Sequence, residues 1–571
     1  MKRRIVIVGG VAAGASAATR ARRLNAEAEI VIFERSGFVS FANCGLPYYV
    51  GDIIKERHAL LLQTPEGLKR RFDVDVRVRH EVTAIDREEK RVRVKNLDTG
   101  KETWEPYDRL ILAPGASAIV PPFAGVRSPN VFTLRSMEDT DAFRNFVDHH
   151  EVKRAAIVGA GFIGLEAAEA LAHRGVAVDV IEMAPQVLPP LDEDMASMVA
   201  VHLREKHVAL HLGSPVRDLR VTGERVTGVV LADGQIVDAD LVLLAIGVRP
   251  NVGLAKATGL EIGPNGGIRV NERMETSDPS ILAAGDAVEV DHTVTGESAL
   301  IPLAGPANKH GRLAGEIAAT DDGPPAPSVA GTAIVKVFDQ TVAVTGLSRR
   351  AADRAGIDAA HVVIRRGHHV GYYPGAEAMT FKLVYEPGSR RVLGAQIVGG
   401  AGVDRRIDIV ATAIHFRGTV DDLAALDLAY APQYGAAKDP IHIAAFTAGN
   451  QDRGLVRHID PASVPAIAAA GYQIVDVRTP QEFDRGAICG AVNIGVDELR
   501  HRAGELAVDR PIAVYCQVGQ RSYLASRILS GLGREDVVSV AGGYTAYNLY
   551  LRAAQPSGLR SGSTTAVACG A

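Results

Sequence analysis

The chain has 571 residues, which at roughly 150 residues per domain predicts about three to four domains. Its net charge of −4 gives no sign of a nucleic-acid partner. No apolar run reaches the roughly 18 residues of a membrane span, and two glycines cut short the first apolar run, so neither a membrane segment nor a secretion signal is expected. The four cysteines lie far apart, which is not the pattern of a disulfide scaffold and favours a reducing cytoplasm.

The N-terminal region has the order strand, glycine-rich turn, helix, strand. Its parts are residues 4–8, Gly9-Gly10-Val11-Ala12-Ala13-Gly14, residues 15–25 and residues 29–33. Gly9 and Gly14 suit a tight turn that aims a helix N-terminus at a pyrophosphate, and Glu34 follows where a ribose is bound. Val11 stands where the motif usually has its middle glycine, so a glycine-rich turn without a ligand is the alternative.

The same pattern recurs further along the chain. Its parts are residues 155–158, Gly159-Ala160-Gly161-Phe162-Ile163-Gly164, residues 165–174 and residues 176–181. All three motif glycines, Gly159, Gly161 and Gly164, are present here, and the strand ends at Glu182. Two such units in one chain predict two dinucleotides. Glu182 can accept hydrogen bonds from an unphosphorylated ribose and would repel a 2′-phosphate, so NADH is preferred over NADPH.

Two further strands close the first fold. Residues 110–115 end in small residues that include Ala113 and Gly115, and residues 281–286 end in Gly285-Asp286. With these segments the chain resembles the two-dinucleotide flavoprotein disulfide reductases. The resemblance implies that the NAD domain is inserted in the FAD domain, that Ala113 and Gly115 line the FAD site, and that Asp286 binds the flavin ribityl chain.

Cys44 lies just after the first dinucleotide unit, in Ser40-Phe41-Ala42-Asn43-Cys44-Gly45-Leu46-Pro47. A helix N-terminus or a nearby cation would favour its thiolate. No second cysteine is within reach, so Cys44 either pairs with a substrate sulfur or cycles through sulfenic acid. The segment closely resembles the coenzyme A-disulfide reductases, a single-cysteine branch. The sister NADH oxidases and peroxidases place a histidine where this chain has Ala12.

Coenzyme A carries a 3′-phosphate and a pyrophosphate, so its site needs cations. The resemblance implies that it contacts the first helix and the residues before the cysteine. A solvated basic face is the alternative for each arginine. The substrate-binding candidates are Arg20, Arg23, Ser40, Asn43, Gln63 and Arg71.

Two tyrosine segments, residues 371–375 and 429–434, also resemble those of the family. The resemblance implies that Tyr372 and Tyr430 flank the thiol of the other subunit, with Lys438 near the substrate. A phenol there can protonate a leaving thiolate. The alternative is that these tyrosines belong to a dimer core.

Residues 474–494 and the loop Cys516–Arg521 resemble a single rhodanese domain, although Ala487 and Cys489 replace the usual histidine and proline. Cys516 leaves a strand and enters a turn closed by a helix. Backbone N–H groups of such a turn, with Arg521, favour a thiolate and cradle a persulfide.

Together these motifs predict an α/β chain with two Rossmann-like dinucleotide-binding domains, an α+β dimerisation domain and a C-terminal rhodanese α/β domain. The expected bounds are 1–120 and 249–325 for FAD binding, 121–248 for NAD(H) binding, 328–450 for dimerisation, 459–556 for the rhodanese domain and 557–571, with Cys569, for a disordered tail.

The resemblance implies an FAD-dependent, NADH-driven reductase of coenzyme A persulfide, polysulfide or coenzyme A disulfide. Cys44 is the expected redox thiol, and Cys516 handles sulfane sulfur. The expected partners are a second copy that shares the active site, small sulfur substrates and a sulfur-donor protein; no metal is expected. An NADH oxidase or peroxidase is one alternative. A sulfur carrier or sensor with a regulatory flavin part is another.

Overall fold

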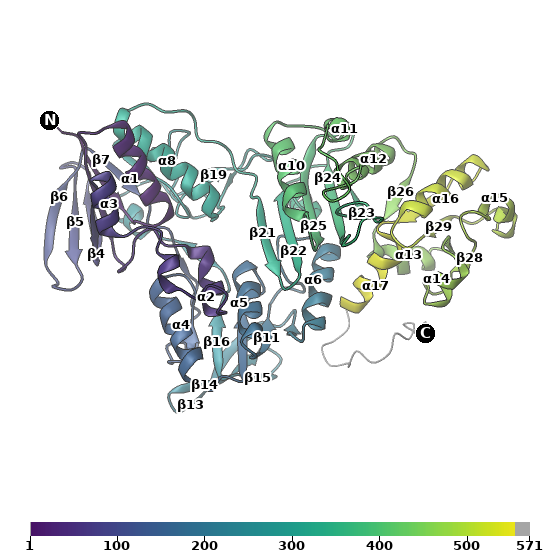
Figure 1. The fold of residues 1–571 in the computed structure, drawn as a ribbon, viewed down its shortest axis with the longest axis horizontal. Helices are drawn as coiled ribbons and strands as arrows, with labels where there is room; N and C mark the ends of the chain where they lie inside the picture. The colour runs from purple at the N-terminus through teal and green to yellow at the C-terminus, as the bar shows by residue number, and fades with distance from the viewer. Residues whose placement is uncertain (1, 554–571) are drawn as a thin grey trace. The chain divides into compact units, whose positions relative to one another are not determined.

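The computed structural model describes residues 2–553 and divides into two compact units (Figure 1). The first runs up to Met183 and resumes at Ser214–Gly331, and the second comprises Ala184–Gly213 and the chain from Thr332 onwards. The α/β class expected from the sequence is confirmed. The predicted tail, 557–571, lies outside the described residues. Within the described chain, every helix is too short or too polar to cross a membrane.

The first unit is built on a parallel sheet in the order β18-β7-β1-β2-β3. Its strands are β1 (Arg4–Val8), β2 (Glu29–Glu34), β3 (Asp75–Val78), β7 (Arg109–Leu112) and β18 (Ile281–Ala283). The strands β1, β2, β7 and β18 are short, mainly apolar and largely buried on both faces, as expected when helices cover a parallel sheet, whereas the edge strand β3 is only partly buried. β18 joins β7 from far along the chain, so the residues between them form an insertion.

The insertion holds a second parallel set in the order β11-β10-β16-β9. Its strands are β9 (Val131–Phe132), β10 (Arg154–Val158), β11 (Ala177–Ile181) and β16 (Leu241–Leu244), and its helices include α4 (Met137–His149) and α5 (Phe162–His173). This unit also contains two three-stranded antiparallel sheets. They are β4 (His80–Asp86), β5 (Arg91–Asn96) and β6 (Glu102–Pro106), and β13 (Val216–Thr222), β14 (Arg225–Leu231) and β15 (Ile236–Asp238).

The second unit contains an antiparallel sheet and a parallel sheet. The antiparallel sheet has the order β21 (Ala333–Val337), β22 (Gln340–Gly346), β25 (Val392–Gly399), β24 (Ala378–Tyr385) and β23 (Ala360–Gly367). Helices that pack on it include α6 (Glu193–Glu205), α10 (Val403–His415) and α12 (Pro440–Asp452). The parallel sheet has the order β26 (Arg457–Ile459), β30 (Val537–Val540), β29 (Ile512–Tyr515), β27 (Gln473–Asp476) and β28 (Val492–Asn493). Its helices include α14 (Pro480–Asp484), α16 (Gln520–Gly531) and α17 (Gly543–Ala553).

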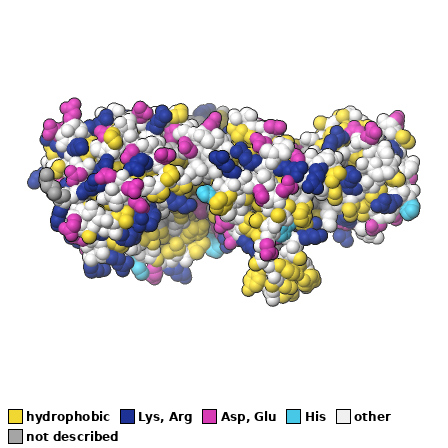
Figure 2. Space-filling model, turned by 90° about the horizontal axis from the view of Figure 1, so that it is seen from above, with side chains coloured by type: hydrophobic (Ala, Val, Ile, Leu, Met, Phe, Trp, Pro, Cys, Tyr) yellow, Lys and Arg dark blue, Asp and Glu magenta, His cyan; other side chains and the backbone are white. Residues whose placement is uncertain are grey.

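Figure 2 shows hydrophobic side chains gathered in places on the surface among the charged ones. Several large ones in the second unit belong to α12 or to the loops beside α10. Phe416 is 75% exposed, Tyr434 70% and Phe446 43%. These three side chains remain in contact with water in the single chain.

Helices α1 (Ala12–Leu24) and α8 (Ala304–Thr320) pack at very short range. A Cβ added at Gly311 would lie 2.2 Å from the carbonyl oxygen of Ala13, and one at Gly315 would lie 2.2 Å from that of Ala17. The two glycines therefore let backbone meet backbone, and α8 holds α1 in place behind the first glycine turn.

We expect Gly311→Ala to destabilise the chain by about 1–3 kcal/mol, because the methyl group forces the two helices apart. Thermal unfolding of the full chain measures this as a lower midpoint. Gly305→Ala in the same helix is the matched control, since a Cβ there meets nothing within 4 Å. An unchanged midpoint for Gly311→Ala would show that the contact between the helices is not tight.

Candidate functional site

The first glycine turn is a close-packed cradle at the carboxyl end of β1. Gly9 has φ +93°, and a Cβ there would lie 2.1 Å from the Ala113 carbonyl oxygen. A Cβ at Gly14 would lie 1.8 Å from the carbonyl oxygen of Gly9. At the end of β2, the buried Glu34 carboxylate accepts a 2.8 Å hydrogen bond from the N–H of Gly10. The turn and its acidic residue therefore form one structure, as a dinucleotide site requires.

The second turn repeats this construction. Gly159 has φ +109°, with its added Cβ 2.3 Å from the Ala245 carbonyl oxygen, and a Cβ at Gly164 would lie 2.0 Å from the carbonyl oxygen of Gly159. Glu182 accepts a 2.8 Å hydrogen bond from the N–H of Ala160. The middle residues of the two motifs, Val11 and Gly161, both directly precede a helix. Val11 therefore leaves the first turn intact.

Three further predicted cofactor residues lie at the carboxyl ends of β7 and β18. Ala113 packs on Gly9, and Gly115 has φ +64°. The Asp286 carboxylate pairs with Arg135 at 2.6 Å, and Arg135 also donates to the Ala116 carbonyl oxygen at 3.0 Å. The carboxyl ends of parallel strands are where open α/β sheets bind ligands, so these residues fit a bound dinucleotide. Sequence reasoning missed Arg135, because its partner is distant in the chain.

Cys44 is an exposed free thiol in a 3-10 turn, Asn43–Gly45, that leads into the short helix α2 (Leu46–Val50). The pKa of the thiol is raised, first by desolvation and then by the negative charge of Glu166, while Arg135 acts in the opposite direction. Asp286 adds to the increase. The expected stabilisation of the thiolate is therefore not found, because desolvation and the two carboxylates together outweigh the nearby cation Arg135.

Glu166 and Tyr48 form a polar pair beside this thiol. The Tyr48 hydroxyl donates to Glu166 Oε1 at 2.9 Å, and burial raises the pKa of both groups. The pair joins α2 to α5, which pack closely where Gly51 meets Ala170. Sequence reasoning missed both residues. The available signal was their spacing, since Glu166 lies two residues after Gly164 and Tyr48 four after Cys44.

The structure brings some of the predicted coenzyme A contacts together near Cys44. The backbone oxygen of Ser40 accepts from the N–H groups of Leu62 and Gln63, at 3.0 and 3.3 Å. Asn43 directly precedes the thiol. These three predicted residues, Ser40, Gln63 and Asn43, are therefore neighbours.

The three arginines that were predicted to bind coenzyme A differ in whether their guanidinium groups are already paired with a carboxylate. Arg20 is committed to Glu316 of α8, with bonds of 2.7 and 3.0 Å. Arg23 on α1 and Arg71 on α3 (Pro65–Phe72) are exposed. Arg22 ties the ends of these two helices by donating to the Phe72 and Asp73 carbonyl oxygens at 2.8 and 2.9 Å.

Tyr372 and Tyr430 come together in the second unit. Their hydroxyl groups are 3.1 Å apart, and both side chains are exposed. The hydrogen bond shared with Tyr372 raises the pKa of Tyr430. The two phenols therefore form one hydrogen-bonded pair at the surface of this unit. Lys438 is exposed on the same unit.

Cys516 is 1% exposed at the end of β29. Its Sγ accepts a 3.1 Å hydrogen bond from the N–H of Gly519 and lies 3.8 Å from the Ser522 hydroxyl. Arg521 makes two 2.7 Å hydrogen bonds to Glu482, and this pairing lowers the pKa of Glu482 to about 2. The loop thus directs a backbone N–H at the sulfur, but a carboxylate already balances the charge of Arg521.

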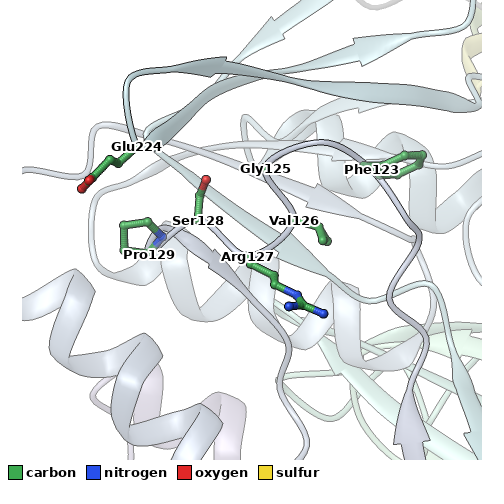
Figure 3. A pocket seen from close by; sticks show the side chains of 7 residues that line it. All are labelled: Phe123, Gly125, Val126, Arg127, Ser128, Pro129 and Glu224. Atoms are coloured by element: carbon green, nitrogen blue, oxygen red, sulfur yellow. The ribbon is translucent and has the colours of Figure 1, made fainter.

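An open pocket of about 540 Å³ lies in the first unit beside the hairpin of β13 and β14 (Figure 3). Its lining comes from residues 123–129 and Glu224, and Arg127 and Glu224 extend from its rim. None of its residues belongs to the predicted site. The exposed thiol and the glycine cradles, not this hollow, define the candidate site.

We expect Glu166→Gln to lower the pKa of Cys44, because the variant removes a negative charge that disfavours the thiolate. The pH profile of Cys44 alkylation in the full chain measures this as a shift to lower pH. Glu151→Gln, an exposed carboxylate paired with Lys153, is the control and leaves the profile in place. A profile that stays put or moves to higher pH in Glu166→Gln contradicts the assignment.

Comparisons with known proteins agree with this geometry. The family model described as pyridine nucleotide-disulphide oxidoreductase matches residues 3–311, and the model of its dimerisation domain matches residues 332–439. A rhodanese-like domain matches residues 464–549.

Two curated relatives each match about three quarters of the chain. The coenzyme A disulfide reductase of Staphylococcus haemolyticus is 35% identical over 446 residues, which are 78% of this chain and 99% of that protein. An NADH oxidase of Methanocaldococcus jannaschii is 37% identical over 447 residues, 77% of this chain and 98% of that protein.

Solved structures match almost the whole length. The structure titled reduced Bacillus anthracis CoADR-RHD has a TM-score of 0.93 at 43% identity and covers 97% of this chain and 99% of that one. The NAD-dependent persulfide reductase from A. fulgidus has a TM-score of 0.90 at 39% identity and covers 95% and 99%. The chain therefore belongs to the pyridine nucleotide-disulphide oxidoreductase family and carries a C-terminal rhodanese-like domain.

Proposed function

We propose that this enzyme is an FAD-dependent, NADH-driven reductase of sulfur substrates in which Cys44 is the redox thiol. The observation that carries the proposal is a single free thiol in the same unit as two dinucleotide cradles. Relatives named coenzyme A disulfide reductase and NAD-dependent persulfide reductase support it. The substrates we propose are coenzyme A persulfide, polysulfide and coenzyme A disulfide.

The two cradles divide the cofactors between them. On this proposal residues 1–120 and 249–325 bind FAD, with Gly9, Gly14 and Glu34 at the adenosine end and Ala113, Gly115 and Asp286 near the flavin. Residues 121–248 bind NADH through Gly159, Gly161, Gly164 and Glu182. When bound, the flavin supplies the route by which two electrons from NADH reach the sulfur of Cys44.

Coenzyme A is the proposed carrier of the substrate sulfur. Asn43 directly precedes the thiol, and a backbone hydrogen bond joins Gln63 to Ser40. Arg23 and Arg71 are exposed cations that can meet phosphate oxygens. Arg20 uses two of its nitrogens on Glu316, so it offers a phosphate only the remaining one. Lys438 of the partner subunit completes the candidate contacts.

The chemistry at Cys44 is a thiol–disulfide exchange. The Cys44 thiolate attacks the inner sulfur of a persulfide, the S–S bond breaks, and HS⁻ leaves as a mixed disulfide forms between Cys44 and coenzyme A. Two electrons from NADH then cleave this disulfide and release the coenzyme A thiolate. With coenzyme A disulfide the first leaving group is a second coenzyme A thiolate. Glu166 and Tyr48 set the protonation of Cys44 between turnovers.

The active site is shared in the proposed homodimer. Residues 328–450 form the dimerisation domain, and its exposed apolar side chains, Phe416, Phe446 and Tyr434, would lose contact with water there. Tyr372 and Tyr430 of the partner subunit then reach the thiol and protonate the leaving sulfur. The scattered cysteines place the enzyme in the cytoplasm on this proposal.

Steady-state NADH oxidation with coenzyme A disulfide, coenzyme A persulfide and polysulfide, measured side by side, tests the function. We expect a preference of at least ~10-fold for one of them, which is ~1.4 kcal/mol of transition-state stabilisation. Cys44→Ser is the control and abolishes all three activities. Oxidation of NADH that is the same with and without each sulfur substrate refutes the proposal.

A second candidate is an NADH oxidase or peroxidase, which the Methanocaldococcus relative favours. Such an enzyme consumes oxygen or peroxide in step with NADH and needs no sulfur substrate. Ala12 and the rhodanese-like domain argue against it. Oxygen uptake recorded during the same assays distinguishes the two functions.

Residues 459–556 are the proposed sulfur-loading domain. Cys516 receives sulfane sulfur from an outside donor, such as a donor protein, and passes it on to coenzyme A for reduction at Cys44. We expect Cys516→Ser to leave reduction of coenzyme A persulfide unchanged and to slow the use of bulky or polymeric sulfur donors. NADH oxidation with each donor measures this. Equal loss for every substrate contradicts the division of labour.

A further inference from the structure

A second pocket, of about 130 Å³, lies wholly within the second unit. It is formed where α6 meets the antiparallel sheet and α17, the last helix of the rhodanese-like domain (Figure 1). Its polar lining consists of His202 and Glu205 from α6 and Gln340 and Arg365 from the sheet, and Leu549 of α17 closes one side. None of these residues takes part in the proposed reaction.

Arg365 is the main charge in this pocket. It lies on β23 and is half-buried, and its Nη1 donates to the Thr380 hydroxyl at 2.9 Å. No carboxylate of residues 2–553 forms an ion pair with it, and burial lowers its pKa. A guanidinium that is taken partly out of water without an anion is costly, and its planar donors match the oxygens of an oxyanion.

The other charges around the pocket are already balanced. Glu205 pairs with Arg552 at 2.7 Å, and Lys206 pairs with Asp339 at 3.2 Å. The carboxylate of Glu377 lies against Gly400, which lines the pocket. No cation of residues 2–553 forms an ion pair with Glu377, so it is the group that opposes an anion.

A second half-buried arginine, Arg204, belongs to α6 but lies outside the lining of the pocket. Arg204 donates to the carbonyl oxygens of Arg552 and Ala553 at 3.2 and 2.9 Å, its Nε is buried without a partner among the described residues, and burial lowers its pKa. Within the lining itself, Arg365 is the cation that no carboxylate of the described residues pairs with.

Gln340 supplies a further polar atom. Its Oε1 is buried and has no hydrogen-bond partner within the described part of the chain. Rotation of the side-chain amide would turn its NH₂ group to the same place, so Gln340 can donate to an anion or accept from a protonated one. A buried polar atom of this kind needs a ligand or an ordered water.

We propose that this pocket binds a small tetrahedral oxyanion, with Arg365 as its principal ligand and Gln340 as its second. Sulfate, thiosulfate and inorganic phosphate share the chemistry that the pocket recognises. Because the lining includes α6, the sheet and α17, a bound anion strengthens the attachment of the rhodanese-like domain to the rest of its unit. The proposal does not rest on the function of Cys44.

The test is calorimetric titration of the full-length protein with sulfate, thiosulfate and phosphate at constant ionic strength, with chloride as the reference anion. We expect saturable binding of at least one tetrahedral anion, and affinity weakened ~10-fold or more in Arg365→Gln, because charge-assisted hydrogen bonds are lost. Arg366→Gln is the matched control, since neighbours on a strand face opposite sides. The anion that binds best identifies whether the source is sulfur chemistry or phosphate.

Two outcomes overturn the proposal. One is no saturable binding of any of the three anions to the unaltered protein. The other is an equal loss of affinity in Arg365→Gln and Arg366→Gln. We expect Arg365→Lys to retain part of the affinity, because it keeps the positive charge. Unchanged NADH oxidation in Arg365→Gln, Arg365→Lys and Arg366→Gln shows that these variants are folded.

Discussion

A disulfide joins two sulfur atoms about 2 Å apart, so a redox cysteine without a second thiol in its fold must form its disulfide with a ligand. Cys44 is in that position, because the other free thiol of the described chain, Cys516, belongs to a different unit. The surroundings of Cys44 in the first unit suit a thiol that forms its disulfide with a ligand. The thiol is exposed, Asn43 directly precedes it, and desolvation and the negative charge of Glu166 oppose its ionisation.

The electrons for such a thiol must come through cofactors. The two dinucleotide cradles have the same construction. In each, a glycine turn packs against a carbonyl oxygen of a neighbouring strand end, and a glutamate accepts a 2.8 Å bond from the turn. The glycine turn thus holds the glutamate carboxylate in place through a backbone N–H group. A ribose hydroxyl could take the place of that N–H group as the donor to the carboxylate. The second unit contributes different chemistry, namely paired phenols at Tyr372 and Tyr430 and a buried thiol at Cys516.

Sequence patterns predicted the fold class, both glycine turns and the two thiols, because each depends on residues that are close in sequence. Contacts between distant segments were not predictable in the same way. The pairing of Arg20 with Glu316 and of Arg521 with Glu482 reduces the free charge of two predicted ligands, and neither partner is marked by a motif. Arg135 and the pair Tyr48–Glu166 were missed because their roles arise only when helices and strand ends meet. Arg365 was missed because its significance lies in the absence of a carboxylate partner among the described residues, which no sequence motif marks.

The central claim is that Cys44 forms its disulfide with coenzyme A. Intact-mass spectrometry of the full-length protein after treatment with coenzyme A disulfide tests this most directly, followed by peptide mapping and then by addition of NADH. The account predicts one coenzyme A adduct per chain, located on Cys44, absent from Cys44→Ser, and discharged by NADH. An adduct located only on Cys516, or a Cys44 that is converted to sulfenic acid and never carries coenzyme A, would contradict it.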